Sequence, residues 1–123
     1  MRALADLLDD DPDPDAVLEW VDGCGTLDRE LYRTAVDAED PLTIEQLADA
    51  VDRDRSTTYR AVRRLHEHGY FDRERETYET GGYCYRYEAV DPEIVAGRLS
   101  ERLSRCYDAM QSLVDEFRDG YAR

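Results

Sequence analysis

The chain has 123 residues, 41% of them hydrophobic, and a formal net charge of -14. This length corresponds to one domain of ordinary size, or to a small domain with helical extensions. No apolar run approaches the roughly 18 residues that a membrane-spanning helix requires, and the N-terminal residues lack the pattern of a signal peptide. We therefore expect a cytoplasmic protein without a membrane partner.

The cysteines and histidines give no sign of a metal site, a cofactor or a disulfide framework. Cys24, Cys84 and Cys106 are odd in number and include no close pair. No Cys-x-x-Cys or His-x-x-x-His spacing occurs, and His66 and His68, two residues apart, diverge on a helix. No nucleophile, base and orienting group cluster together, and no glycine loop suits a phosphate, so an enzyme is not expected.

The N-terminal third predicts three short helices, at Ala3–Leu8, Ala16–Val21 and Leu27–Ala38. The Gly23–Gly25 turn ends the second helix, because glycine adopts the left-handed backbone at low cost. Thr26 is the predicted N-cap of the third helix. The first two helices form an N-terminal extension over residues 1–25.

Two further helices joined by a polar turn are predicted within residues 41–69. Thr43, followed by Gln46 three residues later, has the pattern of a capping box at the start of the first of them. The second runs from about Arg55 to His68, and Gly69 ends it. We expect its buried face to consist of Thr58, Val62 and Leu65.

After this helix the pattern becomes alternating, which predicts two strands at 71–80 and 83–90. The glycines between them predict a hairpin with a two-residue turn. This turn sets the expected cross-strand pairs, Tyr78 with Tyr85 and Arg75 with Glu88. Three helices and a hairpin over residues 26–90 define a mostly α fold with a small β-hairpin, the winged helix-turn-helix.

A long helix is predicted over the C-terminal part, residues 91–123. Its apolar positions recur at alternating three- and four-residue spacing, as at the contact face of a coiled coil. They are Ala96, Leu99, Leu103, Cys106, Met110, Leu113 and Phe117. This apolar stripe is roughly 30 Å long, which is longer than so small a domain can cover. Its length therefore favours a homodimer over packing against the helix's own domain.

Arginines gather in one part of the acidic chain. Residues 53–86 hold eight arginines and six acids, so this part is slightly basic and the remainder strongly acidic. If the predicted buried face turns inward, Ser56, Arg60 and Arg63 face outward, and DNA phosphate explains such a face. The alternative is a solvated surface on which the arginines pair with neighbouring acids.

The candidate DNA contacts follow from side-chain chemistry. Arg60 is the expected base reader, because a guanidinium can bond guanine O6 and N7 together, and helix-turn-helix proteins read bases with the first turns of this helix. Arg63 and Arg64 suit phosphates farther along, and Arg86 lies on the opposite face of the hairpin from Arg73. The full set is Thr43, Arg55, Ser56, Thr57, Tyr59, Arg60, Arg63, Arg64, Arg73, Arg75 and Arg86.

Three segments, 42–51, 55–65 and 69–74, resemble the TrmB-type winged-helix regulators of archaea. The resemblance covers roughly Leu27 to Val90 and implies a dimeric transcription factor whose third helix enters the major groove of double-stranded DNA. The sequence leaves no room for the sugar-sensing domain of larger members, so no sugar response is expected and the effector is unknown. A protein-interaction adaptor on the same scaffold, favoured by the acidic total, is the alternative.

All 16 basic residues are arginine, and the chain lacks Lys and Asn. This composition resembles that of salt-in halophilic archaea, where about 1 M salt shortens the Debye length to about 3 Å. Single-domain members of such organisms resemble regulators of oxidative stress, which makes Cys24 the redox candidate. We expect it to be accessible between two glycines, where the dipole of the following helix favours a thiolate; a small residue filling a turn is the alternative.

Overall fold

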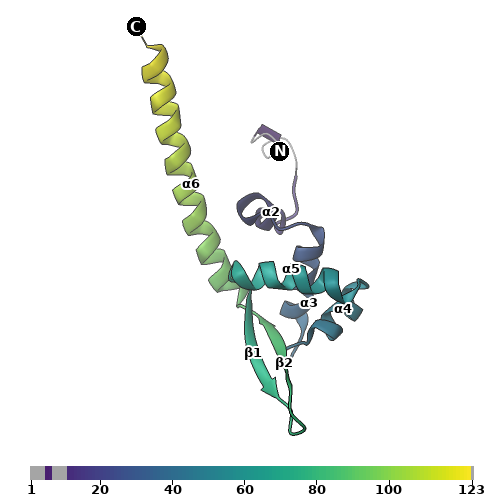
Figure 1. Ribbon diagram of the computed structural model, residues 1–123. Helices are drawn as coiled ribbons and strands as arrows, with labels where there is room; N and C mark the ends of the chain where they lie inside the picture. The colour runs from purple at the N-terminus through teal and green to yellow at the C-terminus, as the bar shows by residue number, and fades with distance from the viewer. Residues whose placement is uncertain (1–4, 7–10, 123) are drawn as a thin grey trace.

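The computed structural model describes residues 5–6 and 11–122 (Figure 1). The helix expected at Ala3–Leu8 lies largely outside these residues. The described elements are α2 (Ala16–Asp22), α3 (Thr26–Asp37), α4 (Ile44–Val51), α5 (Arg55–Glu67), β1 (Phe71–Thr77), β2 (Tyr83–Ala89) and α6 (Pro92–Tyr121). The predicted winged helix-turn-helix, from α3 to β2, is confirmed. No helix of the described residues is long and apolar enough to cross a membrane.

The core lies where α3, α4 and α5 pack together above the base of the hairpin. The predicted inward face of α5 is confirmed, since Thr58, Val62 and Leu65 are at most 1% exposed. At the base of the hairpin the Tyr32 hydroxyl donates a hydrogen bond of 2.8 Å to the Val90 carbonyl. The opposite face of α5 is consequently held toward solvent.

The caps of α3 and α4 arise differently. The capping box of α4 is confirmed: the Thr43 N–H donates to the Gln46 side chain at 2.9 Å, and the Gln46 N–H donates to the Thr43 hydroxyl at 3.2 Å. The cap predicted for α3 is wrong, because Thr26 is the first helical residue and Gly25 is the N-cap. The Asp28 carboxylate accepts the Gly25 N–H at 3.2 Å, so an acid within the first turn supplies the acceptor.

The predicted hairpin register is wrong by three residues. In the structure Arg75 lies opposite Tyr85, and Glu88 lies opposite Asp72. The turn begins at Tyr78, whose N–H donates to the Gly82 carbonyl at 3.0 Å and whose carbonyl accepts the Gly81 N–H at 3.1 Å. Both glycines have positive φ, 90° and 85°. They therefore occupy the last part of a longer loop rather than the centre of a two-residue turn.

Helix α6 begins against the body of the protein and then leaves it. Its N-cap is Asp91, whose carboxylate accepts the Glu93 N–H at 2.8 Å. In the first turns Val95 and Leu99 are buried in the core. Beyond them the helix projects away from the body, roughly opposite to the hairpin (Figure 1). Most of its length is therefore free of contacts within the described chain.

A buried ionic cluster fixes α6 to the end of α5, and we call it the Asp22–Arg102 junction. Asp22, the last residue of α2, has a side chain only 6% exposed. Arg102 Nη1 donates to both of its carboxylate oxygens at 2.5 Å, and the Tyr70 hydroxyl donates to one of them. Arg102 Nη2 also donates to the His68 carbonyl at 3.4 Å. One carboxylate thus joins α2, the end of α5 and α6.

A second arginine of α6 explains the glycine after α5. Arg98 Nη1 donates to the Gly69 carbonyl at 2.8 Å. Gly69 has φ of 86°, and a Cβ atom added there would approach Arg98 Nη1 to 2.7 Å. Any other residue would strain the backbone and displace the Arg98 side chain. The helix stop read from the sequence is therefore also a docking point for α6.

We predict that Arg102→Ala lowers the free energy of unfolding by about 2 kcal/mol, because it leaves the buried Asp22 charge without its cation. Urea unfolding at one fixed protein concentration measures this change. Arg105→Ala is the matched control, since Arg105 is exposed and forms no ion pair among the described residues. Equal unfolding curves for the two variants would show that the junction contributes nothing to stability.

Candidate DNA-binding surface

The outward face of α5 is fixed at its start by Asp54. The Asp54 carboxylate accepts the Thr57 N–H at 3.2 Å, and hydrogen bonding to Thr57 lowers the pKa of this acid. The cap holds the first helical turn in place while the opposite face is buried. The exposed residues of the outward face are Arg55, Ser56, Tyr59, Arg60, Arg63 and Arg64. Thr57 is partly buried beside them.

Arg60, the predicted base reader, is exposed and keeps its charge available. Its Nη2 donates weakly to the Thr57 hydroxyl at 3.5 Å. No carboxylate of the described residues lies within 4.0 Å of it, which distinguishes it from its two neighbours on the helix. The guanidinium is therefore oriented by a neutral partner and free to form a two-bond contact with an acceptor pair.

Arg63 and Arg64 are paired with acids. Arg63 Nε donates to Glu67 at 3.2 Å across one exposed helical turn, a contact of little energy that an incoming phosphate can replace. Arg64 Nη2 donates to Asp28 at 3.1 Å, and the side chain of Asp28 is only 10% exposed. The expected phosphate contact of Arg64 therefore competes with a bond that holds α5 against α3.

The hairpin separates its arginines by face, as predicted. The Arg73 guanidinium lies 4.1 Å from the centre of the Tyr85 ring, and that of Arg75 lies 3.9 Å from the centre of the Tyr83 ring. Stacking on the rings leaves the N–H edges of both guanidinium groups exposed. On the other face, Arg86 Nε donates to Glu76 at 2.5 Å, which lowers the pKa of that acid.

The arginine face of the hairpin continues toward α5. Tyr87, on the same strand face as Tyr85, is 3% exposed at the base of the hairpin. Its ring centre lies 6.4 Å from that of His66 on α5, in an edge-to-face arrangement. The tyrosines therefore pack a sheet face against α5 at the base and carry arginines toward the tip.

Arg53, which is absent from the predicted set of DNA contacts, belongs with the available arginines. It is exposed in the turn that precedes α5. The arginines of this part without a carboxylate within 4.0 Å among the described residues are Arg53, Arg55, Arg60, Arg73 and Arg75. Thr43 lies at the start of α4 with its hydroxyl engaged as the cap. The arginine count alone indicated Arg53, since no helical pattern covers it.

The expected accessibility of Cys24 is wrong. The residue is 4% exposed, and its N–H donates to the Leu18 carbonyl at 3.2 Å, which folds the turn back over α2. Burial, and to a smaller extent the negative charge of Asp28, raise the pKa of the Cys24 thiol to about 11. The thiol is therefore protonated near neutral pH, where the reactive form is the thiolate. Cys84 is half-buried and Cys106 is exposed.

The apolar stripe of α6 divides into two parts. Leu99 is 6% exposed and belongs to the protein's own core. Ala96, three residues earlier, is exposed beside the body. The positions from Leu103 onward lie beyond the body and are open to solvent, together with aromatic and aliphatic residues that the spacing rule omitted. The exposed set is Leu103, Cys106, Tyr107, Met110, Leu113, Val114, Phe117 and Tyr121.

A capped helix with free outward arginines beside a two-stranded wing is the architecture of winged-helix transcriptional regulators. A possible transcriptional regulator from Methanosarcina mazei has this fold, with a TM-score of 0.76 and 18% identity over 83% of this chain and 86% of that chain. The ST1889 protein of Sulfolobus tokodaii has a TM-score of 0.64 and 20% identity over 78% and 93% of the two chains. At these identities the likeness concerns the fold.

The model of the family described as "Sugar-specific transcriptional regulator TrmB" matches residues 23–93. The chain belongs to this family. Two uncharacterized proteins of Methanocaldococcus jannaschii, MJ1503 and MJ1082, are 33% and 35% identical to it over 76 and 77 residues. These matches cover 62% and 63% of this chain, and 58% and 63% of the relatives. The chain thus matches less than two thirds of either relative's length.

We predict that iodoacetamide modifies Cys24 at least about tenfold more slowly than Cys84 at pH 8, because Cys24 is buried and its thiolate is scarce. Mass mapping of the peptides over time measures both rates in one sample. The rates should converge when the protein is unfolded in guanidinium chloride. Fast labelling of Cys24 in the folded protein would contradict its burial and support the accessible thiol predicted from the sequence.

Proposed function

We propose that this protein is a sequence-specific regulator of transcription that binds double-stranded DNA as a homodimer. The proposal rests on the exposed and unpaired guanidinium of Arg60 among the described residues. Arg60 lies in the second turn of a helix whose start is capped by Asp54 and whose opposite face is fully buried. It is exposed and has no carboxylate partner among the described residues.

In the proposed complex, α5 lies in the major groove and Arg60 bonds O6 and N7 of a guanine. Ser56 and Thr57 supply hydroxyl groups to nearby phosphates or base edges. Arg73 and Arg75 meet the neighbouring stretch of backbone or minor groove with the exposed edges of their stacked guanidinium groups. The two surfaces adjoin, because the base of the hairpin packs against α5 through Tyr87.

The exposed stripe of α6 supports the homodimer. From Leu103 to Tyr121 it extends roughly 27 Å at about 1.5 Å per residue. Soluble monomers rarely expose one continuous apolar face of this length. A second copy of the chain offers the same face, and pairing two α6 helices places two α5 helices on one DNA molecule. The proposed dimer contacts are Leu103, Cys106, Met110, Leu113 and Phe117, with Leu99 at the edge.

The proposal places the protein in a salt-rich cytoplasm, which reconciles the net charge of -14 with DNA binding. At about 1 M salt the acids far from the contact are screened within about 3 Å. The arginines in direct contact still bond phosphates, with an affinity that falls as salt rises. A redox response through Cys24 would first require the turn around it to open.

We predict that Arg60→Ala removes the preference for a site selected from a random DNA pool. A two-bond contact to guanine discriminates by about 1–3 kcal/mol, so the ratio of specific to nonspecific affinity should fall by about tenfold or more. Fluorescence anisotropy with the selected site and a scrambled duplex measures the ratio. Arg105→Ala, on the far side of α6, is the control. A ratio unchanged by Arg60→Ala would remove this residue from base reading.

We predict that Met110→Asp converts the dimer to a monomer, because it places a charge in the centre of the apolar stripe. Ser112→Asp is the matched control: it adds the same charge to the same helix but faces away from the stripe. Sedimentation velocity gives the mass of each variant. A wild-type protein that sediments as a monomer, or a Met110→Asp variant that remains dimeric, would contradict this interface.

A further inference from the structure

We propose that the cavity between α2, α3 and α6 binds a small amphipathic organic anion: an apolar ring or chain that carries a carboxylate. The coupling of this site to DNA rests on the proposed function, whereas the binding itself does not. The cavity measures about 770 Å³, within the range of about 300–1,000 Å³ that is usual for small-molecule sites.

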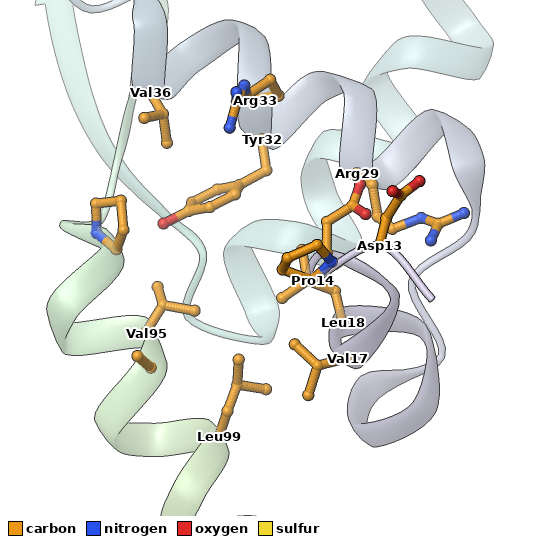
Figure 2. A pocket seen from close by; sticks show the side chains of 13 residues that line it. Asp13, Pro14, Val17, Leu18, Arg29, Tyr32, Arg33, Val36, Val95 and Leu99 are labelled. Carbon is orange, nitrogen blue, oxygen red and sulfur yellow. The ribbon is translucent and has the colours of Figure 1, made fainter. Parts of the chain in front are cut away.

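Apolar side chains from three helices form the walls of the cavity (Figure 2). Val17 and Leu18 come from α2, Val36 comes from α3, and Val95 and Leu99 come from α6. Tyr32 adds an aromatic ring between α3 and α6 (Figure 2), and its hydroxyl is already bonded to the Val90 carbonyl. Such walls suit the apolar body of a ligand.

Two arginines give the cavity its charged side. Arg29 and Arg33 are one turn apart on α3, so they lie on the same helix face, and both line the cavity. The Arg29 side chain is only 20% exposed, and its buried Nε has no acceptor among the described residues. Among the described residues, the acid within 4.0 Å of its guanidinium is Glu19, 3.8 Å from Nη2. A rotation of the Arg29 side chain that turns the guanidinium into the cavity would let a ligand carboxylate supply the missing acceptor and offset the cost of this buried donor.

The acids at the cavity do not reverse this preference. Asp13 and Asp15 also line it, but both are exposed and therefore solvated. Neither lies within 4.0 Å of a basic group of the described residues. A ligand changes the environment of the buried Arg29 donor more than that of the solvated acids. Arg29 therefore decides that the cavity favours a negatively charged ligand.

The position of the cavity connects it to the proposed DNA reader. Val95 and Leu99 line it from α6 and also adjoin the Asp22–Arg102 junction, where α6 meets the end of α5. A ligand held between α3 and α6 therefore acts on the turn of α6 that fixes its angle to α5. In a dimer that angle sets the separation of the two recognition helices, and the coupling is reciprocal between ligand and DNA.

The probes are 2-naphthoate and its neutral isostere 2-naphthamide, titrated into isotopically labelled free protein and followed by NMR. We expect naphthoate to bind with Kd of about 1 mM or tighter, and naphthamide to bind at least about tenfold more weakly. Arg29→Met should weaken naphthoate about tenfold by removing the donor. Ala96→Trp, which fills the cavity from an exposed position of α6, should abolish binding; Arg105→Met should change nothing.

Several outcomes would overturn the site: no shifts up to 10 mM naphthoate (about tenfold above the expected Kd), equal affinity for the two probes, or unaltered binding by Ala96→Trp. The last result would assign the probe to the exposed stripe of α6. Saturating naphthoate should also change the Kd for the selected DNA site by about threefold or more, and an unchanged value would overturn the coupling. Naphthoate binding by a protein that binds no DNA would leave the site standing and refute the proposed function.

Discussion

The arrangement of the molecule depends on the buried carboxylate of Asp22. This group lies at the end of a short helix, and Arg102 and Tyr70 both donate to it. Without those partners the cost of burying its charge would oppose the packing of α6 against α5. With them, α6 and the end of α5 are joined through one carboxylate. In the proposed homodimer, the contact that determines the spacing of the two copies is therefore ionic and internal to each chain, while the proposed contact between chains is apolar.

The chain is acidic overall, so its positively charged surface does not come from an excess of arginine. It comes from arginines that are not paired with acids. Among the described residues, Arg63, Arg64 and Arg86 are each bonded to an acid, whereas Arg60 and the stacked arginines of the hairpin are not. In the salt-rich cytoplasm proposed above, bulk attraction to DNA would be screened, so the proposed contact does not depend on it. What matters is a helix with one fully buried face and one face that keeps a free guanidinium.

Local patterns predicted the helices from Ala16 onward, the capping box at Thr43 and the inward face of α5, because each depends on residues within one or two turns. The hairpin register failed since two adjacent glycines fit a short turn as well as the end of a longer loop. Local sequence patterns could not predict contacts between distant segments. Arg102 contacts Asp22 across 80 positions, and Arg64 contacts Asp28 across 36. The burial of Cys24 has the same origin, since Tyr70, from a distant part of the chain, lies beside its thiol and the turn folds back over α2.

We propose that two copies of α5, held by α6, read one duplex. Hydroxyl-radical footprinting on a selected site tests it most directly, because it maps backbone contacts on both strands. A homodimer should give two protected patches related by two-fold symmetry on one face of the duplex, about 34–36 Å apart or at a multiple of that spacing. A single patch, or uniform weak protection without symmetry, would contradict it.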